Sequence, residues 1–91
     1  MRRRVVITGL GAVTPLGITA KESWTNLIAN QSGISTLDLG ARVACKVAGK
    51  VPSKFDFVKS HPSYSSTQKY LAPFMQFGLA AAEEALADAA W

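Results

Sequence analysis

The chain has 91 residues, of which 48% are hydrophobic and 18% are charged, and its formal net charge is +4. This length allows at most one small domain, and so short a chain buries only a modest share of its surface. The apolar runs are too short for a membrane span, and the single cysteine excludes an internal disulfide and a multi-cysteine metal site.

Part of the positive charge comes from the cluster Arg2-Arg3-Arg4. No aromatic residues are interleaved with these arginines, so stacking on a single-stranded nucleic acid is not indicated. A solvated segment ahead of a buried strand is the more common role for such a cluster. The apolar residues that follow are interrupted at once by Thr8 and Gly9, so a secretory signal is not expected. A mitochondrial presequence is not expected either, because the fold is predicted to begin at about residue 4.

A strand is predicted over 4–8, in the segment VVITGLGAVTPLG that begins at Val5. Its apolar run is rich in β-branched residues, which favours a strand buried on both faces. Gly9 and Gly11 end this strand, and the turn TPLG leads into a helix. A strand, a glycine loop and a helix in this order predict the start of an α/β unit.

A glycine loop between a strand and a helix also raises the possibility of phosphate binding. The dinucleotide fingerprint needs a third small residue where Thr14 stands, and a P-loop needs four residues between its glycines, whereas Gly11 and Gly17 enclose five. Both templates fail, so the loop is interpreted as a turn that packs the helix close to the strand. A small α/β nucleotide binder stays as an alternative that these failures weaken.

The next predicted element is a helix over 20–29. Thr19 and Glu22 fit a capping box, in which each residue satisfies a free backbone amide of the other. Apolar residues then recur at helical spacing and form one face that is expected in the core. They are Trp24, Leu27 and Ile28.

Residues 36–42 are predicted to be irregular. Apolar and polar residues alternate after them, which predicts a strand over 43–51 with one buried and one partly wet face. Cys45 falls on the buried face, without a histidine or a helix amino terminus beside it, and is interpreted as an inert thiol.

Residues 52–67 hold two prolines and five serines, which predicts a surface loop with one short turn. Phe55 and Phe57 are expected to anchor this loop to the body of the protein. His61 is the only histidine; it precedes a proline and has no metal-ligand partners around it, so it is interpreted as an exposed loop residue.

The last predicted element is a helix over 73–90. Pro73 suits its first turn, and the alanines between 80 and 90 favour a helix strongly. Met75 and Phe77 are expected to pack in the core rather than to line a ligand pocket.

Several segments, in order, resemble the amino terminus of a known family. They are RRVVITGLGAVTPLG, the helix with Trp24 followed by NQSGIS, VAG at 47–49, and FMQFGLAAAEEAL at 74–86. Together they resemble the β-ketoacyl-acyl-carrier-protein synthases, the condensing enzymes of fatty acid synthesis, and above all the elongating type of bacteria and mitochondria. The resemblance covers nearly the whole chain, with a divergent middle from 55 to 66.

The resemblance implies a fold and a chemistry. The fold is α/β, a thiolase-like αβαβα layered architecture, of which residues 1–91 would form a partial amino-terminal domain. The family condenses acyl groups with malonyl carried on acyl carrier protein, using a cysteine at a helix amino terminus and two histidines. Cys45 and His61 match none of the motifs that carry these groups. The resemblance therefore implies no catalytic, cofactor-binding or metal-binding residue in this chain.

The resemblance also implies partners and a location. An intact member is expected to be a homodimer that docks acyl carrier protein, with no cofactor, nucleic acid or membrane, in the mitochondrial matrix or the cytoplasm. The chain is interpreted as the amino-terminal part of a longer synthase, inactive and poorly folded alone, because its apolar elements need partners. The alternative is a stand-alone binding or regulatory module that docks on a full-length synthase subunit.

Overall fold

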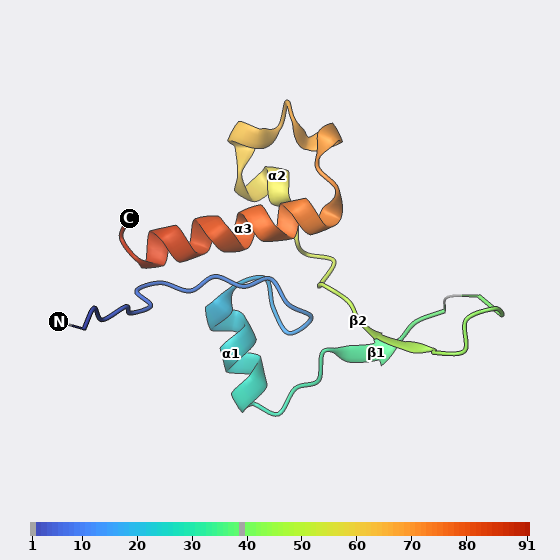
Figure 1. Ribbon diagram of the computed structural model, residues 1–91. Coiled ribbons are helices and arrows are strands. Elements are labelled where there is room, and N and C mark those ends of the chain that lie inside the picture. The colour runs from blue at the N-terminus through green and yellow to red at the C-terminus, as the bar shows by residue number, and fades with distance from the viewer. Residues whose placement is uncertain (1, 39) are drawn as a thin grey trace.

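The computed structural model describes residues 2–38 and 40–91. Figure 1 shows the longest helix, α3, in the middle, with the amino-terminal segment and α1 on one side and the short helices on the other. Over the described ranges the structure is mixed α/β, with one two-stranded antiparallel sheet. In chain order the elements are α1 (Ala20–Ile28), β1 (Ile34–Thr36), β2 (Val47–Gly49), α2 (Phe57–Ser60), the 3-10 turns η1 (Pro62–Tyr64) and η2 (Gln68–Tyr70), and α3 (Pro73–Asp88).

The prediction of a helix over 20–29 is confirmed to within one residue by α1. The Thr19 hydroxyl accepts a hydrogen bond from the Glu22 amide at 3.1 Å, as the capping box predicts. The Glu22 carboxylate forms an ion pair with Lys54, so only one half of the box is seen. Asn30, with φ of 65°, adopts the left-handed conformation that commonly ends a helix.

The prediction of a helix over 73–90 is confirmed by α3, which ends two residues earlier. Pro73 lies in its first turn, where the missing amide hydrogen costs nothing. Ala90 has φ of 56° and marks the end of the helical backbone.

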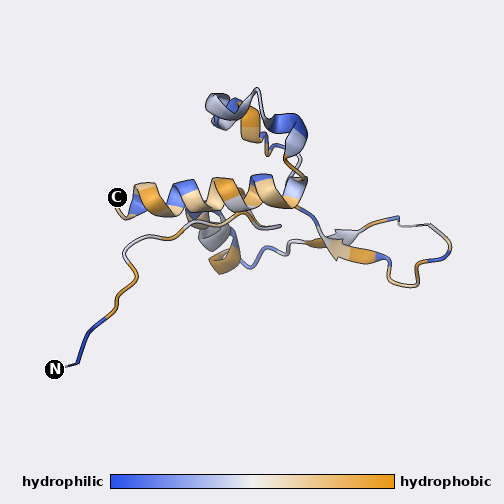
Figure 2. Ribbon diagram, turned by 45° about the horizontal axis from the view of Figure 1, so that its top comes forward, coloured by the Kyte–Doolittle hydropathy of each residue, from blue (hydrophilic) through white to orange (hydrophobic). Residues whose placement is uncertain are grey.

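The strand predicted over 4–8 does not form. Across residues 2–38 and 40–91 no second strand lies beside this segment, so its backbone groups have no ladder to join. Val5 is 94% exposed and Ile7 is 82% exposed, and Figure 2 shows the segment as an apolar trace leading away from the body. A run that is apolar on both faces needs strands beside it and layers above and below it. The described residues, 2–38 and 40–91, place no strand beside this run, and its side chains stay exposed.

The strand predicted over 43–51 is correct only at its centre. β2 covers Val47–Gly49 and pairs antiparallel with β1, so that Ile34 lies opposite Gly49. The prediction of an irregular segment over 36–42 overlooked that Thr36 ends β1, and residue 39 lies outside the described residues. Cys45 is exposed, contrary to the prediction, because it lies ahead of β2, in a two-stranded ribbon that is too small to bury it.

The segment 52–67 is more regular than predicted, since it contains α2 and η1. The Asp56 carboxylate caps α2 by accepting from the Lys59 amide at 3.1 Å. The two predicted anchors are confirmed: Phe57 is 1% exposed, and the Phe55 ring meets the edge of Phe77 with centroids 5.1 Å apart.

The structure is open for its size. Its radius of gyration is 16.3 Å, whereas about 12 Å is typical of a compact domain of this length. Its accessible surface is 7432 Å², against roughly 5100 Å² for a compact monomer of the same mass. Phe57 is the one buried hydrophobic side chain among the described residues, and Trp24, expected in the core, is 62% exposed. Leu27, Ile28 and Met75 are exposed as well, so the prediction that these residues lie in the core is wrong.

Candidate functional site

The glycine segment lies directly against α3. A Cβ atom built on Gly9 would overlap the Ala85 carbonyl oxygen, and one on Gly11 would overlap the Ala81 carbonyl oxygen. The two backbones thus approach more closely than any side chain allows, which is the use of glycine at such positions. The interpretation of the pattern as a packing device is supported, but the helix it packs on is α3 rather than the helix that follows it.

Two carboxylates of α3 hold the glycine segment in place. The Leu10 amide donates to Asp88 Oδ2 at 3.0 Å, and the Ala12 amide donates to Glu84 Oε1 at 2.9 Å. Glu84 and Asp88 are four residues apart and so lie on one face of the helix. Both hydrogen bonds have an acidic side chain as the acceptor, and such charge-assisted bonds are stronger than bonds between neutral groups.

Glu84 also caps α1. The Ala20 amide, at the first residue of that helix, donates to Glu84 at 3.0 Å to Oε2 and 3.1 Å to Oε1. The amino terminus of a helix attracts negative charge, and nucleotide-binding loops place a phosphate there. In this chain its own carboxylate fills that position, so a phosphate would meet a like charge. This contact counts against the nucleotide-binding alternative.

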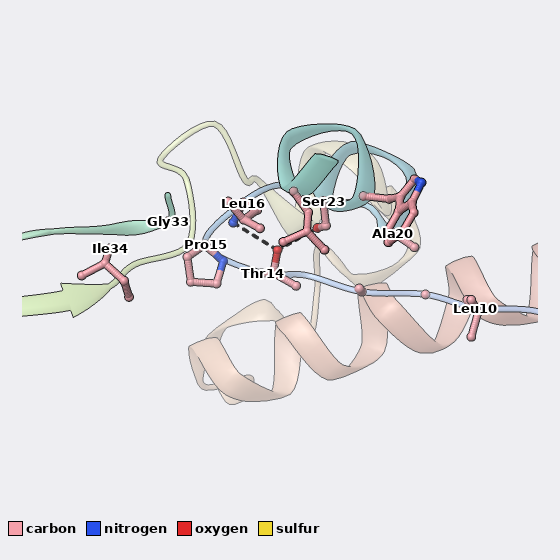
Figure 3. A pocket seen from close by; sticks show the side chains of 12 residues that line it. Leu10, Thr14, Pro15, Leu16, Ala20, Ser23, Gly33 and Ile34 are labelled. Atoms are coloured by element: carbon pink, nitrogen blue, oxygen red, sulfur yellow. Dashed lines mark hydrogen bonds between the residues drawn. The ribbon is translucent and has the colours of Figure 1, made fainter. Parts of the chain in front are cut away.

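The turn at 14–17 forms one wall of an open groove (Figure 3). The Thr14 and Gly17 backbones bond to each other in both directions, at 2.8 and 3.1 Å, and the Thr14 hydroxyl lies 2.7 Å from Ser23 Oγ. The groove has a volume of about 630 Å³ and no titratable side chain in its lining. It offers apolar contact rather than acid–base chemistry. Its larger apolar lining residues are Leu10, Pro15, Leu16, Trp24, Leu27 and Ile34.

His61 belongs to a second cluster, which forms around Glu83, the neighbour of Glu84 on α3. Its Nε2 lies 2.9 Å from Glu83 Oε2, and its Nδ1 lies 3.2 Å from the Phe57 carbonyl oxygen. The Tyr64 hydroxyl donates to Glu83 Oε1 at 3.0 Å. The prediction of an exposed loop histidine is therefore wrong, because a turn of helix begins at Phe57 and brings a residue four positions later onto the same face.

The Glu83 carboxylate changes the chemistry of its tyrosine neighbour. The hydrogen bond that it accepts from Tyr64, and then its negative charge, raise the pKa of the Tyr64 phenol above the ordinary value of 10.0. Tyr64 is thereby held as a donor, which suits a structural role better than that of a base.

The remaining sequence candidate, Cys45, belongs to neither the groove nor the His61 cluster. Its thiol donates to the Val47 carbonyl oxygen at 3.3 Å, within the hairpin region. Within 2–38 and 40–91, no group of three or more histidine, cysteine, aspartate or glutamate side chains could hold a metal ion. Over the same residues, no helix combines the length and the apolar character that crossing a bilayer requires.

Comparison with known proteins identifies the family. The family model described as "Beta-ketoacyl synthase, N-terminal domain" matches residues 2–91. A Schizosaccharomyces pombe protein, named provisionally as a mitochondrial 3-oxoacyl-[acyl-carrier-protein] synthase, is 41% identical over 98% of this chain and 22% of its own length. The 3-oxoacyl-[acyl-carrier-protein] synthase 2 of Rhizobium meliloti is 36% identical over 98% of this chain and 23% of its own. The mitochondrial 3-oxoacyl-[acyl-carrier-protein] synthase of Arabidopsis thaliana is 34% identical over the same shares.

The chain belongs to the β-ketoacyl synthase family and matches its N-terminal domain. It spans about a fifth of the length of the curated relatives it matches. These relatives are named as synthases, and none of these three names describes a regulatory or binding module. The resemblance inferred from the glycine segment and the carboxyl-terminal helix is thus confirmed, and the alternative of a stand-alone module gains no support.

Proposed function

We propose that this chain forms the amino-terminal part of a 3-oxoacyl-[acyl-carrier-protein] synthase, which condenses acyl groups with malonyl-acyl carrier protein in fatty acid biosynthesis. The family match over residues 2–91 supports this proposal, together with the names of the relatives from bacteria and mitochondria. The intact protein would be a homodimer that docks acyl carrier protein, in the mitochondrial matrix or the cytoplasm.

The observation that carries the proposal is the exposed apolar segment at Val5–Ile7. A run of apolar, β-branched residues is typical of a strand that has neighbouring strands on both sides and is covered on both faces. In a thiolase-like layered fold, this segment would be a central strand and the apolar groove beside α1 would be covered by another element. The excess accessible surface of the chain, roughly 2300 Å² above a compact monomer, agrees with such a role.

The chain would supply structure, and the catalytic groups would come from outside it. Both ring nitrogens of His61 already face protein oxygen atoms, and the Cys45 thiol bonds within its own hairpin segment. Neither side chain has the paired nucleophile and base that acyl transfer needs. We therefore expect the isolated chain to have no condensing activity and no cooperative thermal melt.

A chimera tests the proposal directly. This chain would replace the aligned segment of the Rhizobium meliloti synthase 2, and condensation of acyl groups with malonyl-acyl carrier protein would be assayed. The expected result is a soluble, active chimera, while the isolated chain shows no activity. A matched chimera with Gly11→Val should lose solubility, because a side chain there meets the α3 backbone. A soluble, folded chimera without activity, or activity from the isolated chain, would contradict the proposal.

A further inference from the structure

On α3, next to the Glu84 contact that holds the glycine segment, lies a clasp made of His61, Glu83 and Tyr64. Glu83 accepts from Tyr64 with one carboxylate oxygen and meets His61 with the other, at 3.0 and 2.9 Å. The clasp joins the end of α2 and the turn η1 to the middle of α3. The side chains of His61 and Glu83 are 21% and 40% exposed, so the pair is within reach of solvent protons.

Both nitrogens of the His61 ring face oxygen atoms that only accept hydrogen bonds. Nδ1 lies 3.2 Å from the Phe57 carbonyl oxygen, and Nε2 lies 2.9 Å from a carboxylate oxygen of Glu83. A neutral imidazole has one N–H and one lone pair, so it can donate to only one of these two oxygens. The imidazolium has two N–H groups and donates to both. The observed geometry is therefore complete only when the ring is charged.

We propose that His61 and Glu83 form a pH-sensitive clasp that fixes the α2–η1 segment on α3 when the ring is protonated and loosens it when the ring is neutral. Histidine is the side chain whose charge ordinarily changes between pH 5 and 8. The clasp also covers the core, because the His61 ring stacks on the buried Phe57 ring with centroids 4.8 Å apart.

The charged and titratable groups around the ring favour this reading. From α3, the Glu83 carboxylate meets the ring, and Glu84 lines the same cavity as His61, a cavity with a volume of about 440 Å³. From η1, Tyr64 stays protonated throughout this pH range, since its pKa is raised. From the ring's own helix, Lys59 is exposed, and the loop residues Ile18 and Thr19 that line the cavity are uncharged.

Hydrogen exchange of the intact protein that contains this chain, followed by peptide mass spectrometry at pH 6 and pH 8, tests the clasp. Each variant is compared with the wild-type protein at the same pH, which removes the intrinsic pH dependence of exchange. At pH 6 the peptide covering 57–64 should exchange about threefold more slowly in the wild type than in His61→Gln, as for a partly exposed ion pair. At pH 8 the difference should shrink towards none.

Two further variants keep the test decisive. Glu83→Gln preserves the shape of the side chain and removes its charge, so it should abolish the same pH-dependent protection. Tyr64→Phe is the matched control, because it removes a bond to the same carboxylate that does not titrate between pH 6 and pH 8, and its effect should be equal at both. The proposal would be overturned if the exchange rate of the 57–64 peptide in His61→Gln, relative to wild type, were the same at pH 6 and pH 8. It would also be overturned if the pH-dependent protection survived in Glu83→Gln.

Discussion

Substituting Gly11 with alanine should weaken the contact between the glycine segment and α3. The added Cβ would overlap the carbonyl oxygen and carbonyl carbon of Ala81, which are backbone atoms and cannot rotate away. Overpacking of this kind costs about 1–3 kcal/mol. If the segment lifts to relieve it, the hydrogen bonds to Glu84 and Asp88 lengthen as well, each worth about 1–2 kcal/mol at such partly exposed positions. We expect a loss of about 2–4 kcal/mol in the free energy of unfolding.

Gly78→Ala is the matched control, because it makes the same chemical change within α3 itself. A Cβ there would have no atom within 4 Å, apart from its own helix backbone and chain neighbours. Replacing a helical glycine with alanine stabilises a helix by about 1 kcal/mol. The midpoint of urea denaturation of the intact protein should therefore shift in opposite directions for the two variants. Equal effects, or an unchanged midpoint for Gly11→Ala, would refute the argument that the two backbones are in direct contact.

Three other predictions follow from the contacts around α3. Glu84→Ala should lower the free energy of unfolding by about 2–3 kcal/mol, because the amides of Ala12 and Ala20 lose a charged acceptor. Glu84→Gln should lower it less. If urea titrations gave the same loss of stability for both variants, the charge of Glu84 would have no role. Phe57→Ala should cost about 3 kcal/mol and Phe57→Leu distinctly less, since the ring is 1% exposed; similar midpoints for both would argue against a packed ring. The stability that Tyr64 adds should be complete below pH 10 and disappear as the pH rises through its raised pKa, so the difference between wild type and Tyr64→Phe should vanish in alkali; a constant difference would contradict the bond to Glu83.

The two longer helices could be predicted because their signals are local. Thr19 supplies a hydroxyl cap for α1, and Pro73 supplies a fixed first turn for α3. Phe57 could also be predicted as an anchor, since burying a large aromatic side chain removes much apolar surface from water. These features depend on a few neighbouring residues, which a sequence displays directly.

The strand predictions failed where the outcome depends on distant partners. Val5–Ile7 has the composition of a buried strand, but pairing and burial come from other segments, and residues 2–38 and 40–91 place none beside it. The same dependence explains why Cys45 and Trp24 are exposed although their patterns favour burial. Alternation and helical spacing identify which face is apolar, and only packing decides whether that face is covered.

The contacts of the acidic residues could not be read from the sequence at all. Glu84 caps a helix that begins 64 residues earlier, and helix-capping patterns consider only adjacent residues. The His61 cluster left a weak local signal, because Phe57, His61 and Tyr64 follow helical spacing. Two serines and a proline in the same segment obscured it, since they favour a loop.

The pairing of Leu10 with Asp88 spans 78 residues, which has a consequence for how the protein is made. At a translation rate of about 5–20 residues per second, the glycine segment leaves the ribosome roughly 4–16 seconds before α3 is available to receive it. During that interval the glycine segment has no helix to pack on. The apolar residues Val5–Ile7 ahead of it, which stay exposed even with α3 in place, are the kind of segment that aggregates or recruits a chaperone. The arginines at positions 2–4 precede these apolar residues, and such a charge beside an apolar segment is what opposes the association of nascent chains.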